Sequence, residues 1–429
     1  MKQIIPSVKG TRDYYPDEMA FRNRLYQTIR QVSTSFGYQE WEAPMLETLN
    51  LYAAKSGEEL VNQQSFTFPD RGGEILTLRP ELTPSLARMV AQRQNQLVFP
   101  LRWWSWGPFW RYERPQRGRT REFFQWNIDL IGVDSPESDA ELIAVAASFL
   151  KQVGLSSQKA VILINDRQLT NSELAALDVP AEKRPDYLGL IDRRAKMNPS
   201  EWDANAFDLG MKPQQLEGMK AFLDNPELWT KSKTLVRVFT ALEAMGVREY
   251  VRYDPSTIRG LLYYTSTVFE AFALNSDIRR SLLGGGRYDN LMAQVGGDPL
   301  PAVGFAMGDL AIGLLLDALG LVPKEITNTP AEVLVIVFDA ERQSDSMAFS
   351  AELRQAGLKV ICNTEITKLP KQFKFADRIG VRVACVIGPD EAAMNQVTIK
   401  DLLNGTQQTL PRSLAASEIR KLLESHRPL

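Results

Sequence analysis

The stretch Trp110–Asp129, WRYERPQRGRTREFFQWNID, places five arginines between Arg111 and Arg121. It belongs to a longer segment, 97 to 133, in which apolar and polar residues alternate on both sides of a loop. Alternation with a period of two is typical of β-strands with one face in a core. The segment therefore predicts a long antiparallel hairpin, and this hairpin is the starting point for the fold.

The two faces of the hairpin differ in chemistry. One face carries Trp104, Trp106, Trp110 and Tyr112 on the first arm and Phe124, Trp126, Ile128 and Leu130 on the second; the other carries Ser105, Arg111, Glu113, Gln125, Asn127 and Asp129. A polar face of an antiparallel sheet is often simply solvated. The loop RPQRGRTR, 114–121, favours a ligand instead, because its guanidinium groups repel one another unless an anion is present. Phosphates are the natural partners of such groups.

Composition describes an ordinary globular chain. It has 429 residues, 50 Lys+Arg against 52 Asp+Glu, and 44% hydrophobic residues, enough for two or three domains. A net charge of −2 would not by itself hold nucleic acid or an anionic membrane, so any polyanion must meet local patches. The two cysteines, Cys362 and Cys385, stand in apolar runs, which suits buried thiols in a reducing compartment better than a disulfide or zinc site.

Histidine chemistry is nearly excluded, because the only histidine is His426, close to the C-terminus. A Ser-His or Cys-His pair or a His-rich metal site is therefore not expected. The N-terminal MKQIIPSVKG lacks the apolar region of a signal peptide, and Asp309 and Asp317 interrupt the longest apolar run. We expect a cytoplasmic protein.

Patterns along the rest of the chain predict an α+β organisation. Helices are expected at 18–36, 140–153 and near 308–320; strands are expected at GYQEWEAPMLET, 37–48, which contains Pro44, and at 257–272 and 279–285. Residues from about 165 to 250 are rich in helical patterns and predict an inserted helical subdomain. Proline and threonine cluster at 322–332, which marks a domain break. Beyond it, segments alternate as β-α-β-α-β, which predicts a small, mostly parallel α/β domain.

Several stretches together resemble a known family. FWRYERPQRGRTREFFQWNIDLIG, 109–132, resembles motif 2 of the class II aminoacyl-tRNA synthetases, and others resemble the histidyl-tRNA synthetases in particular. These are KGTRDYYP at 9–16, LRPELTPSLAR at 78–88, RGLLYYTSTVFE at 259–270, LLGGGRYDNL at 282–291 and PAVGFAMGD at 301–309. Taken singly they are weaker: triple glycine usually marks a turn, RPELTP could cap a helix and paired tyrosines often belong to a core. Their shared order carries the resemblance.

The resemblance implies an architecture. It predicts a catalytic domain over 1–325, with an antiparallel sheet flanked by helices and the insertion at about 165–250, followed by an α/β anticodon-binding domain at 331–429. GYQEWEAPMLE, 37–47, looks like motif 1, which forms the dimer interface in this class, so a homodimer is expected.

The resemblance also implies site residues. For histidine these are Glu81 and Thr83 at the amino group, Gln125 and Asp129 facing the amino acid, and Tyr263 and Tyr264 lining the imidazole pocket. For ATP they are Arg111 and Arg259 at the α-phosphate, Glu113 beside the adenine, and Arg119 or Arg121 reaching the γ-phosphate. Asp129 stands where the family commonly has the longer glutamate, which bears on direct contact with the imidazole.

The implied reaction is histidine activation with ATP followed by transfer to the 3′ end of tRNA(His). Positioning and neutralisation of oxyanions by Arg111 and Arg259 would dominate, helped by Mg²⁺ bridging phosphate oxygens, and no protein metal ligand is assigned.

One departure keeps an alternative open. The family's motif 3 usually runs GFAMGLER, but this chain reads GFAMGDLA, with Ala311 at the position of the arginine and Leu262 where aspartate is frequent. A regulatory subunit of ATP phosphoribosyltransferase, which binds histidine and charges no tRNA, would suit that loss. Against it stand Arg259, the complete RPQRGRTREF loop and the C-terminal α/β domain. A tRNA-binding scaffold without adenylation would not need Glu81 and Arg111. The sequence therefore favours the ligase.

Overall fold

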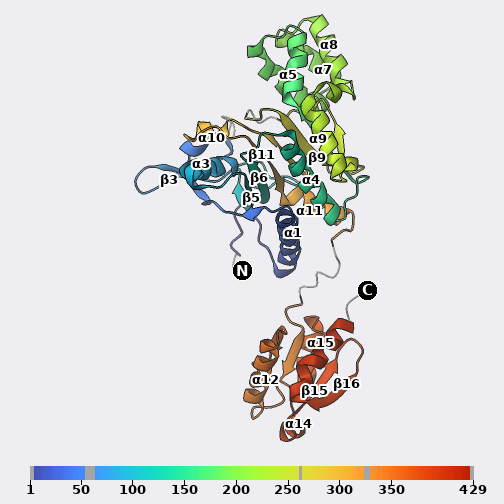
Figure 1. Ribbon diagram of the computed structural model, residues 1–429. Helices are drawn as coiled ribbons and strands as arrows, with labels where there is room; N and C mark the ends of the chain where they lie inside the picture. The colour runs from blue at the N-terminus through green and yellow to red at the C-terminus, as the bar shows by residue number, and fades with distance from the viewer. Residues whose placement is uncertain (1–3, 54–62, 260–262, 323–328, 426–429) are drawn as a thin grey trace. The chain divides into compact units, whose positions relative to one another are not determined.

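The computed structural model describes residues 4–53, 63–259, 263–322 and 329–425 (Figure 1). It divides into two units, one formed by 1–15 and 21–323 and the other by 16–20 and 324–429. His426 and Leu262 lie outside the described residues, as does most of the expected break at 322–332. Within the described residues, no helix combines the length and the apolar character that a membrane span requires.

An eight-stranded sheet forms the centre of the first unit. Its strands, in spatial order, are β1 (Gln39–Glu40), β5 (Leu101–Trp110), β6 (Glu122–Ile131), β11 (Ala302–Gly308), β10 (Leu283–Arg287), β9 (Thr267–Ala273), β7 (Ala160–Asp166) and β8 (Val251–Tyr253). The pairs at the two edges, β1–β5 and β7–β8, are parallel, and the six strands between them pair antiparallel. The predicted hairpin is therefore β5–β6 at the heart of the sheet.

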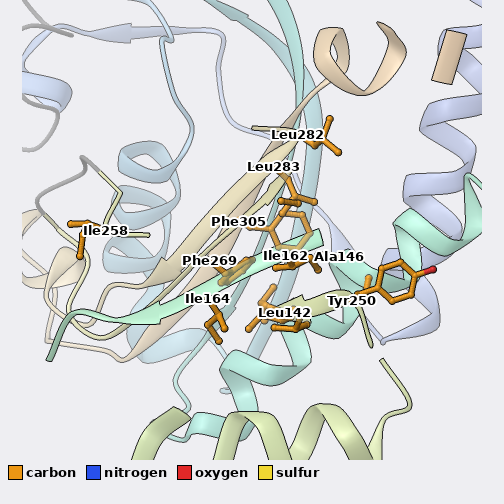
Figure 2. Packing of buried hydrophobic residues seen from close by; sticks show 14 of the residues in the cluster. Leu142, Ala146, Ile162, Ile164, Tyr250, Ile258, Phe269, Leu282, Leu283 and Phe305 are labelled. Atoms are coloured by element: carbon orange, nitrogen blue, oxygen red, sulfur yellow. The ribbon is translucent and has the colours of Figure 1, made fainter. Parts of the chain in front are cut away.

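Helices cover one face of this sheet and build the main core. They are α1 (Pro16–Ser35), α4 (Pro136–Gln152) and α11 (Asp309–Ala318), at the places where the sequence predicts helices. Their apolar residues pack on Trp104 and Trp126 of the hairpin, which are fully buried. Figure 2 shows Leu142 and Ala146 of α4 beside Ile162, Phe269 and Phe305 of the neighbouring strands. Burial thus accounts for the central aromatic residues of the hairpin, whereas Tyr112, beyond the end of β5, is 53% exposed.

A run of helices lies between β7 and β8. It contains α5 (Arg167–Ala176), α6 (Arg184–Asp192), α7 (Pro199–Asp208), α8 (Pro213–Leu223) and α9 (Lys233–Ala244). Asp166 caps α5, since its carboxylate accepts from the backbone N–H of Gln168. This run occupies the stretch in which helical patterns interrupt the strand-rich sequence.

The first unit also contains a three-stranded sheet and the helix α3, which are formed by residues close to the N-terminus of the chain. The small sheet has the order β2 (Leu46–Thr48), β4 (Ile75–Leu78), β3 (Phe66–Pro69), and it is antiparallel. The helices of this region are α2 (Asn50–Ala53), α3 (Thr83–Arg93) and, further along the chain, α10 (Leu291–Gln294). The single strand expected at 37–48 is in fact two, β1 and β2, with Pro44 between them, because proline has no N–H to donate to a ladder.

Two other strand predictions are wrong at their first residues. β9 begins at Thr267 rather than 257, because Arg259 has a φ of 60°, a left-handed conformation that strands do not contain. β10 begins at Leu283 rather than 279, because the preceding residues form the β9–β10 loop, which the Leu282 N–H closes by donating to the carbonyl of Ala271. Both strands are shorter than the apolar pattern suggests.

The second unit is a five-stranded sheet with helices. The spatial order is β13 (Val360–Cys362), β12 (Val333–Ile336), β14 (Val383–Val386), β15 (Gln396–Asp401), β16 (Gln407–Pro411). β13, β12 and β14 are parallel, joined by α12 (Gln343–Gln355) and α13 (Leu369–Arg378), whereas β15 and β16 are antiparallel additions, with α14 (Pro389–Ala393) and α15 (Ala415–Ser425). Cys385 is buried, Cys362 is half-buried, and both are free thiols. The expected β-α-β-α-β order is present.

Candidate active site

A row of very small residues runs across two neighbouring strands of the large sheet, β10 and β11. Directly paired residues share a face, and the register pairs Gly284 with Ala306, Gly286 with Gly304, and Gly308 with Gln125. We call Gly284, Gly286, Gly304, Ala306 and Gly308 the glycine bed. It lies on the face opposite the tryptophan core, beside Gln125, Asn127 and Asp129 of β6. A sheet face without side chains leaves room for other groups directly against the backbone.

Three of the predicted site residues lie directly over the glycine bed. A Cβ at Gly304 would overlap the carboxylate of Asp129, and a Cβ at Gly284 would overlap the guanidinium of Arg259. At Gly286 it would come within 2.9 Å of Cδ1 of Tyr264. The glycines are therefore what allows a carboxylate from β6 and a guanidinium and an aromatic ring from the segment 259–270 to converge on one surface.

The polar face of the hairpin is buried rather than solvated. Ser105 is 1% exposed, Asn127 5% and Asp129 6%. Asp129 accepts a hydrogen bond from the hydroxyl of Tyr288. Burial raises the pKa of Asp129 to about 7, and the Tyr288 bond opposes only part of that rise. Near neutral pH this carboxyl can therefore hold or release a proton.

Tyr263 and Tyr264 form an aromatic wall beside the bed. Their ring centroids are 4.8 Å apart, and the Tyr263 ring meets that of Tyr288 edge-on at 5.9 Å. Burial, followed by the neighbouring Tyr264 and the carboxylate of Glu81, raises the pKa of Tyr263 well above its usual value. Because the carboxylate of Glu81 acts on the Tyr263 hydroxyl, Glu81 belongs to the same site as the tyrosines. Both rings stay neutral and can donate hydrogen bonds.

Glu81 and Thr83 belong to the loop that leads into α3. Glu81 is buried, and its backbone carbonyl accepts from the hydroxyl of Tyr52 at 3.4 Å. Thr83 is the first residue of α3 and Pro84 the second, a favoured place for proline because its missing N–H is not needed there. The loop is joined to the hairpin by Arg111, whose Nε donates to the carbonyl of Pro80 at 2.9 Å.

The arginine-rich loop 114–121, which we call the flap, is folded on itself. Gln116 and Arg119 exchange backbone hydrogen bonds around a tight turn at Gly118, which has a φ of 74°. Arg119 forms an ion pair with the buried carboxylate of Glu113. Glu113 and Arg119, both predicted ATP ligands, therefore neutralise each other in this structure.

Arg121 points toward the N-terminal segment instead of the bed. Its backbone N–H donates to the carbonyl of Gly10, its Nε donates to the carbonyl of Glu113 at 3.3 Å, and its guanidinium lies 4.0 Å from the ring centroid of Tyr112. Gly10, with a φ of 87°, leaves the space that the Arg121 side chain fills. Arg121 thus connects the flap to the KGTRDYYP segment.

Arg259 is held in a strained backbone conformation beside an acid. Its φ of 60° is uncommon for a residue with a side chain and costs about 1–3 kcal/mol in general. Its Nη1 donates to Oε1 of Glu270 at 2.9 Å. Such strain is retained where the surrounding structure requires it, and here it directs the guanidinium onto Gly284.

The helix α11 begins with Asp309. Two residues later, Ala311 occupies the position at which the resembled motif has an arginine. Asp309 accepts from the backbone N–H of Phe124 at 2.9 Å and from the Arg12 guanidinium at 2.7 Å. Ala311 is packed in the main core and is 9% exposed. The segment therefore joins three parts of the chain, and position 311 contributes no charge to the site.

Sequence reasoning did not single out two residues with clear roles. Tyr288, which holds Asp129, stands in LLGGGRYDNL, where only its place after the glycines could have marked it. Arg79 is completely buried, donates to the carbonyls of Pro108 and Ala43, and pairs with Glu42, so it fixes the RPELTP loop to the hairpin. The sequence feature that could have marked Arg79 is its position two residues before Glu81.

Known proteins resemble the whole chain. The family model described as histidyl-tRNA synthetase matches residues 10–311, and the model described as anticodon binding domain matches 332–422. A histidine–tRNA ligase of Opitutus terrae is 38% identical over 96% of this chain and 98% of its own length. One of Haloarcula marismortui is 35% identical over 95% and 96%.

A solved structure agrees with the sequence relatives. The histidyl-tRNA synthetase of a Nostoc species superposes with a TM-score of 0.82 at 28% identity, covering 98% of this chain and all of that one. Both the predicted fold class and the resemblance are thereby confirmed. The chain belongs to the histidyl-tRNA synthetase family.

Proposed function

We propose that the chain is a histidine–tRNA ligase that activates histidine with ATP and transfers it to the 3′ end of tRNA(His). The observation that carries this proposal is the convergence of Asp129, Tyr264 and Arg259 over the glycine bed. This surface offers a proton acceptor, an aromatic wall and a phosphate-binding cation within one site. Relatives whose similarity extends over nearly the whole chain are named histidine–tRNA ligases.

The amino acid end of the site is proposed to hold histidine by charge and shape. The buried carboxylate of Glu81 pairs with the ammonium group, with the hydroxyl of Thr83 beside it. Tyr263 and Tyr264 flank the imidazole, and Asp129 and Gln125 face it from β6. A carboxyl with a pKa near that of imidazole can share a proton with the ring, which suits selection of histidine over other amino acids.

The phosphate end works by neutralising charge. A carboxylate oxygen of histidine attacks the α-phosphorus of ATP, and the bond from that phosphorus to pyrophosphate breaks. Arg259 and Arg111, from separate segments, bind the α-phosphate oxygens as charge builds on them. A ribose hydroxyl of the tRNA then attacks the carbonyl carbon of the adenylate, the ester forms and AMP leaves. Neither step needs a protein nucleophile.

Adenine binding requires the flap to rearrange. Glu113, the proposed adenine contact, is paired with Arg119. When ATP enters, Arg119 can exchange that carboxylate for a phosphate, which binds the same guanidinium fork. The pair therefore keeps two ATP ligands ordered before the nucleotide arrives.

Mg²⁺ fits this site as a partner of the phosphates. Among the described residues no group of three or more His, Cys, Asp or Glu side chains is placed to hold a metal. Mg²⁺ usually binds through substrate phosphates with one or two carboxylates, and Glu270 beside Arg259 offers one. When bound, the ion would neutralise phosphate charge, while Arg259 and Arg111 orient the α-phosphate.

A homodimer is supported by an exposed apolar surface. Leu46 of β2 and Phe68 of β3 share one face of the β2-β4-β3 sheet and are each more than 40% exposed, and Met45, just before β2, is 46% exposed. This surface adjoins the segment 38–48 that resembles the dimer-forming motif. Light scattering at micromolar concentration should give twice the chain mass, and a monomer would remove this part of the proposal.

Amino-acid-dependent exchange of pyrophosphate into ATP tests the function, with all twenty amino acids assayed separately. Exchange with histidine alone, followed by charging of tRNA(His), is the expected result. Histidine binding without exchange would instead favour a regulatory subunit of ATP phosphoribosyltransferase. The matched control is Glu81→Gln, which keeps the side chain's size but removes the charge that pairs with the ammonium.

A further inference from the structure

The ATP end of the site lacks a cation at α11. Ala311 occupies the position where the resembled motif has an arginine, and it is packed in the core. The two flap arginines begin from other contacts: Arg119 is paired with Glu113 until a phosphate displaces that carboxylate, and the guanidinium of Arg121 donates to the carbonyls of Glu113 and Lys9. ATP nevertheless brings charge on its terminal phosphates that a protein cation normally offsets.

Arg280, in the β9–β10 loop, reaches the same place from another segment. A Cβ at Gly118, the turn of the flap, would lie 3.8 Å from Cδ of Arg280 and 3.4 Å from Cδ1 of Leu314. Leu314 is three residues beyond Ala311 on α11, which is about one helical turn. The turn of the flap thus lies next to both the side chain of Arg280 and the helix that carries Ala311.

The charge of Arg280 is available to a ligand. In the ranges that the structure describes, its guanidinium has no acceptor and no acidic partner, although the side chain is half-buried. Its neighbour Arg279 is exposed. A cation on a half-buried side chain beside the turn of the flap is partly desolvated, so a phosphate there would bind it more strongly than at an open surface.

The position of Arg280 is also compatible with a single nucleotide spanning the site. Gly284, over which the Arg259 guanidinium lies, is the fourth residue after Arg280. Even fully extended, that length of chain reaches at most about 14 Å. The Arg259 guanidinium and the backbone of Arg280 therefore lie a short distance apart at the start of β10, and the flap lies beside Arg280.

We propose that Arg280 binds the terminal phosphates of ATP and the departing pyrophosphate, supplying the cation that position 311 lacks. This inference rests on the proposed ligase function. Arg280 forms a guanidinium–phosphate pair under the flap, while Arg259 and Arg111 hold the α-phosphate. The same cation then stabilises pyrophosphate as it leaves.

Arg280→Ala and Arg280→Lys test this, with Arg279→Ala as the matched control one residue away. In histidine-dependent exchange, Arg280→Ala should raise KM for ATP and for pyrophosphate at least ~10-fold and leave KM for histidine unchanged. Arg280→Lys should recover part of the loss because it keeps the charge. Affinity for a nonhydrolysable histidyl-adenylate analogue, which has no terminal phosphates, should not change in any variant.

Two outcomes would overturn the proposal. Arg280→Ala kinetics equal to those of Arg279→Ala would show that Arg280 does not meet the phosphates. An equal loss of affinity for the adenylate analogue would show a structural role instead. Should the unaltered chain give no exchange, the ligase function fails separately, and calorimetric titration with pyrophosphate alone decides the matter: equal affinity in Arg280→Ala and the unaltered chain refutes the site.

Discussion

At the scale of single residues, the carboxyl of Asp129 makes stability depend on pH. Burial raises its pKa from 3.8 to about 7, so the folded state keeps a proton that the unfolded state loses. Its contribution to stability is complete below pH 4 and is lost as pH rises from about 4 to about 7, by about 4 kcal/mol. Asp129→Asn keeps the shape but cannot ionise. Between pH 4 and pH 8 the variant should therefore lose about 4 kcal/mol less stability than the unaltered chain.

Tryptophan fluorescence during urea unfolding measures this difference in the first unit alone. All eight tryptophans lie between Trp41 and Trp229, and none lies beyond residue 323. The exposed Asp298→Asn is the control, and it should follow the unaltered chain at every pH. Parallel curves for Asp129→Asn and the unaltered protein would contradict a raised pKa.

Arg259 is predicted to act in the reaction rather than in histidine binding. Arg259→Ala should reduce histidine-dependent exchange at least ~100-fold, the usual loss for one donor to a developing oxyanion. Histidine affinity measured by calorimetry should stay within a few-fold, since the guanidinium pairs with Glu270 over Gly284. Equal losses in affinity and rate would contradict the assigned role.

Removing Arg259 also leaves Glu270 without its partner, so a second variant is needed. Arg259→Ala/Glu270→Gln removes the unpaired charge and should lose exchange at least as far as Arg259→Ala, since Glu270 is also the carboxylate offered to Mg²⁺. Arg252→Ala, at an exposed position on β8, is the control for loss of an arginine and should keep full activity.

At the scale of elements, β10 works because it lacks side chains on the site face. Gly284→Ala would place a methyl group where the Arg259 guanidinium lies and should displace it. Exchange should fall about as far as in Arg259→Ala, by ~100-fold, while the thermal midpoint changes by only a few degrees, because the displaced group ends a flexible side chain.

The control for this substitution is Gly189→Ala in α6, where a Cβ meets nothing within 4 Å. Alanine is the better helix former, so this variant should be unchanged or slightly more stable. Full activity in Gly284→Ala would show that Arg259 need not lie over the bed.

Elements were predictable from sequence where one face of a strand meets the core. Alternation placed β5 and β6 correctly, because Trp104 and Trp126 must be buried. The same reasoning failed before Thr267, where apolar residues continue but a left-handed Arg259 ends the extended backbone. The convergence of Asp129 with Gly304 depends on pairing between β6 and β11, which lie far apart in sequence. No local pattern contains that register, so only the resemblance could place these residues together.

At the scale of the whole molecule, we expect the two units to divide the work of charging tRNA. The glycine bed and every residue proposed to bind ATP or histidine lie in the first unit, whereas the anticodon-binding family model matches the second, at 332–422. Adenylation needs only the small substrates. Transfer to tRNA also uses binding energy from parts of the tRNA remote from the reacting end.

A chain ending at Val322 should therefore separate the two steps. We expect histidine-dependent pyrophosphate exchange within about two-fold of the full chain, and an unchanged unfolding curve by tryptophan fluorescence, because the main core lies wholly within the first unit. Charging of tRNA(His) should fall at least ~100-fold in kcat/KM, a loss of about 2.7 kcal/mol. Adding the separate second unit should not restore charging at micromolar concentration, because the covalent link sets a much higher effective concentration. Loss of exchange together with charging would show instead that the second unit is needed to form the catalytic site.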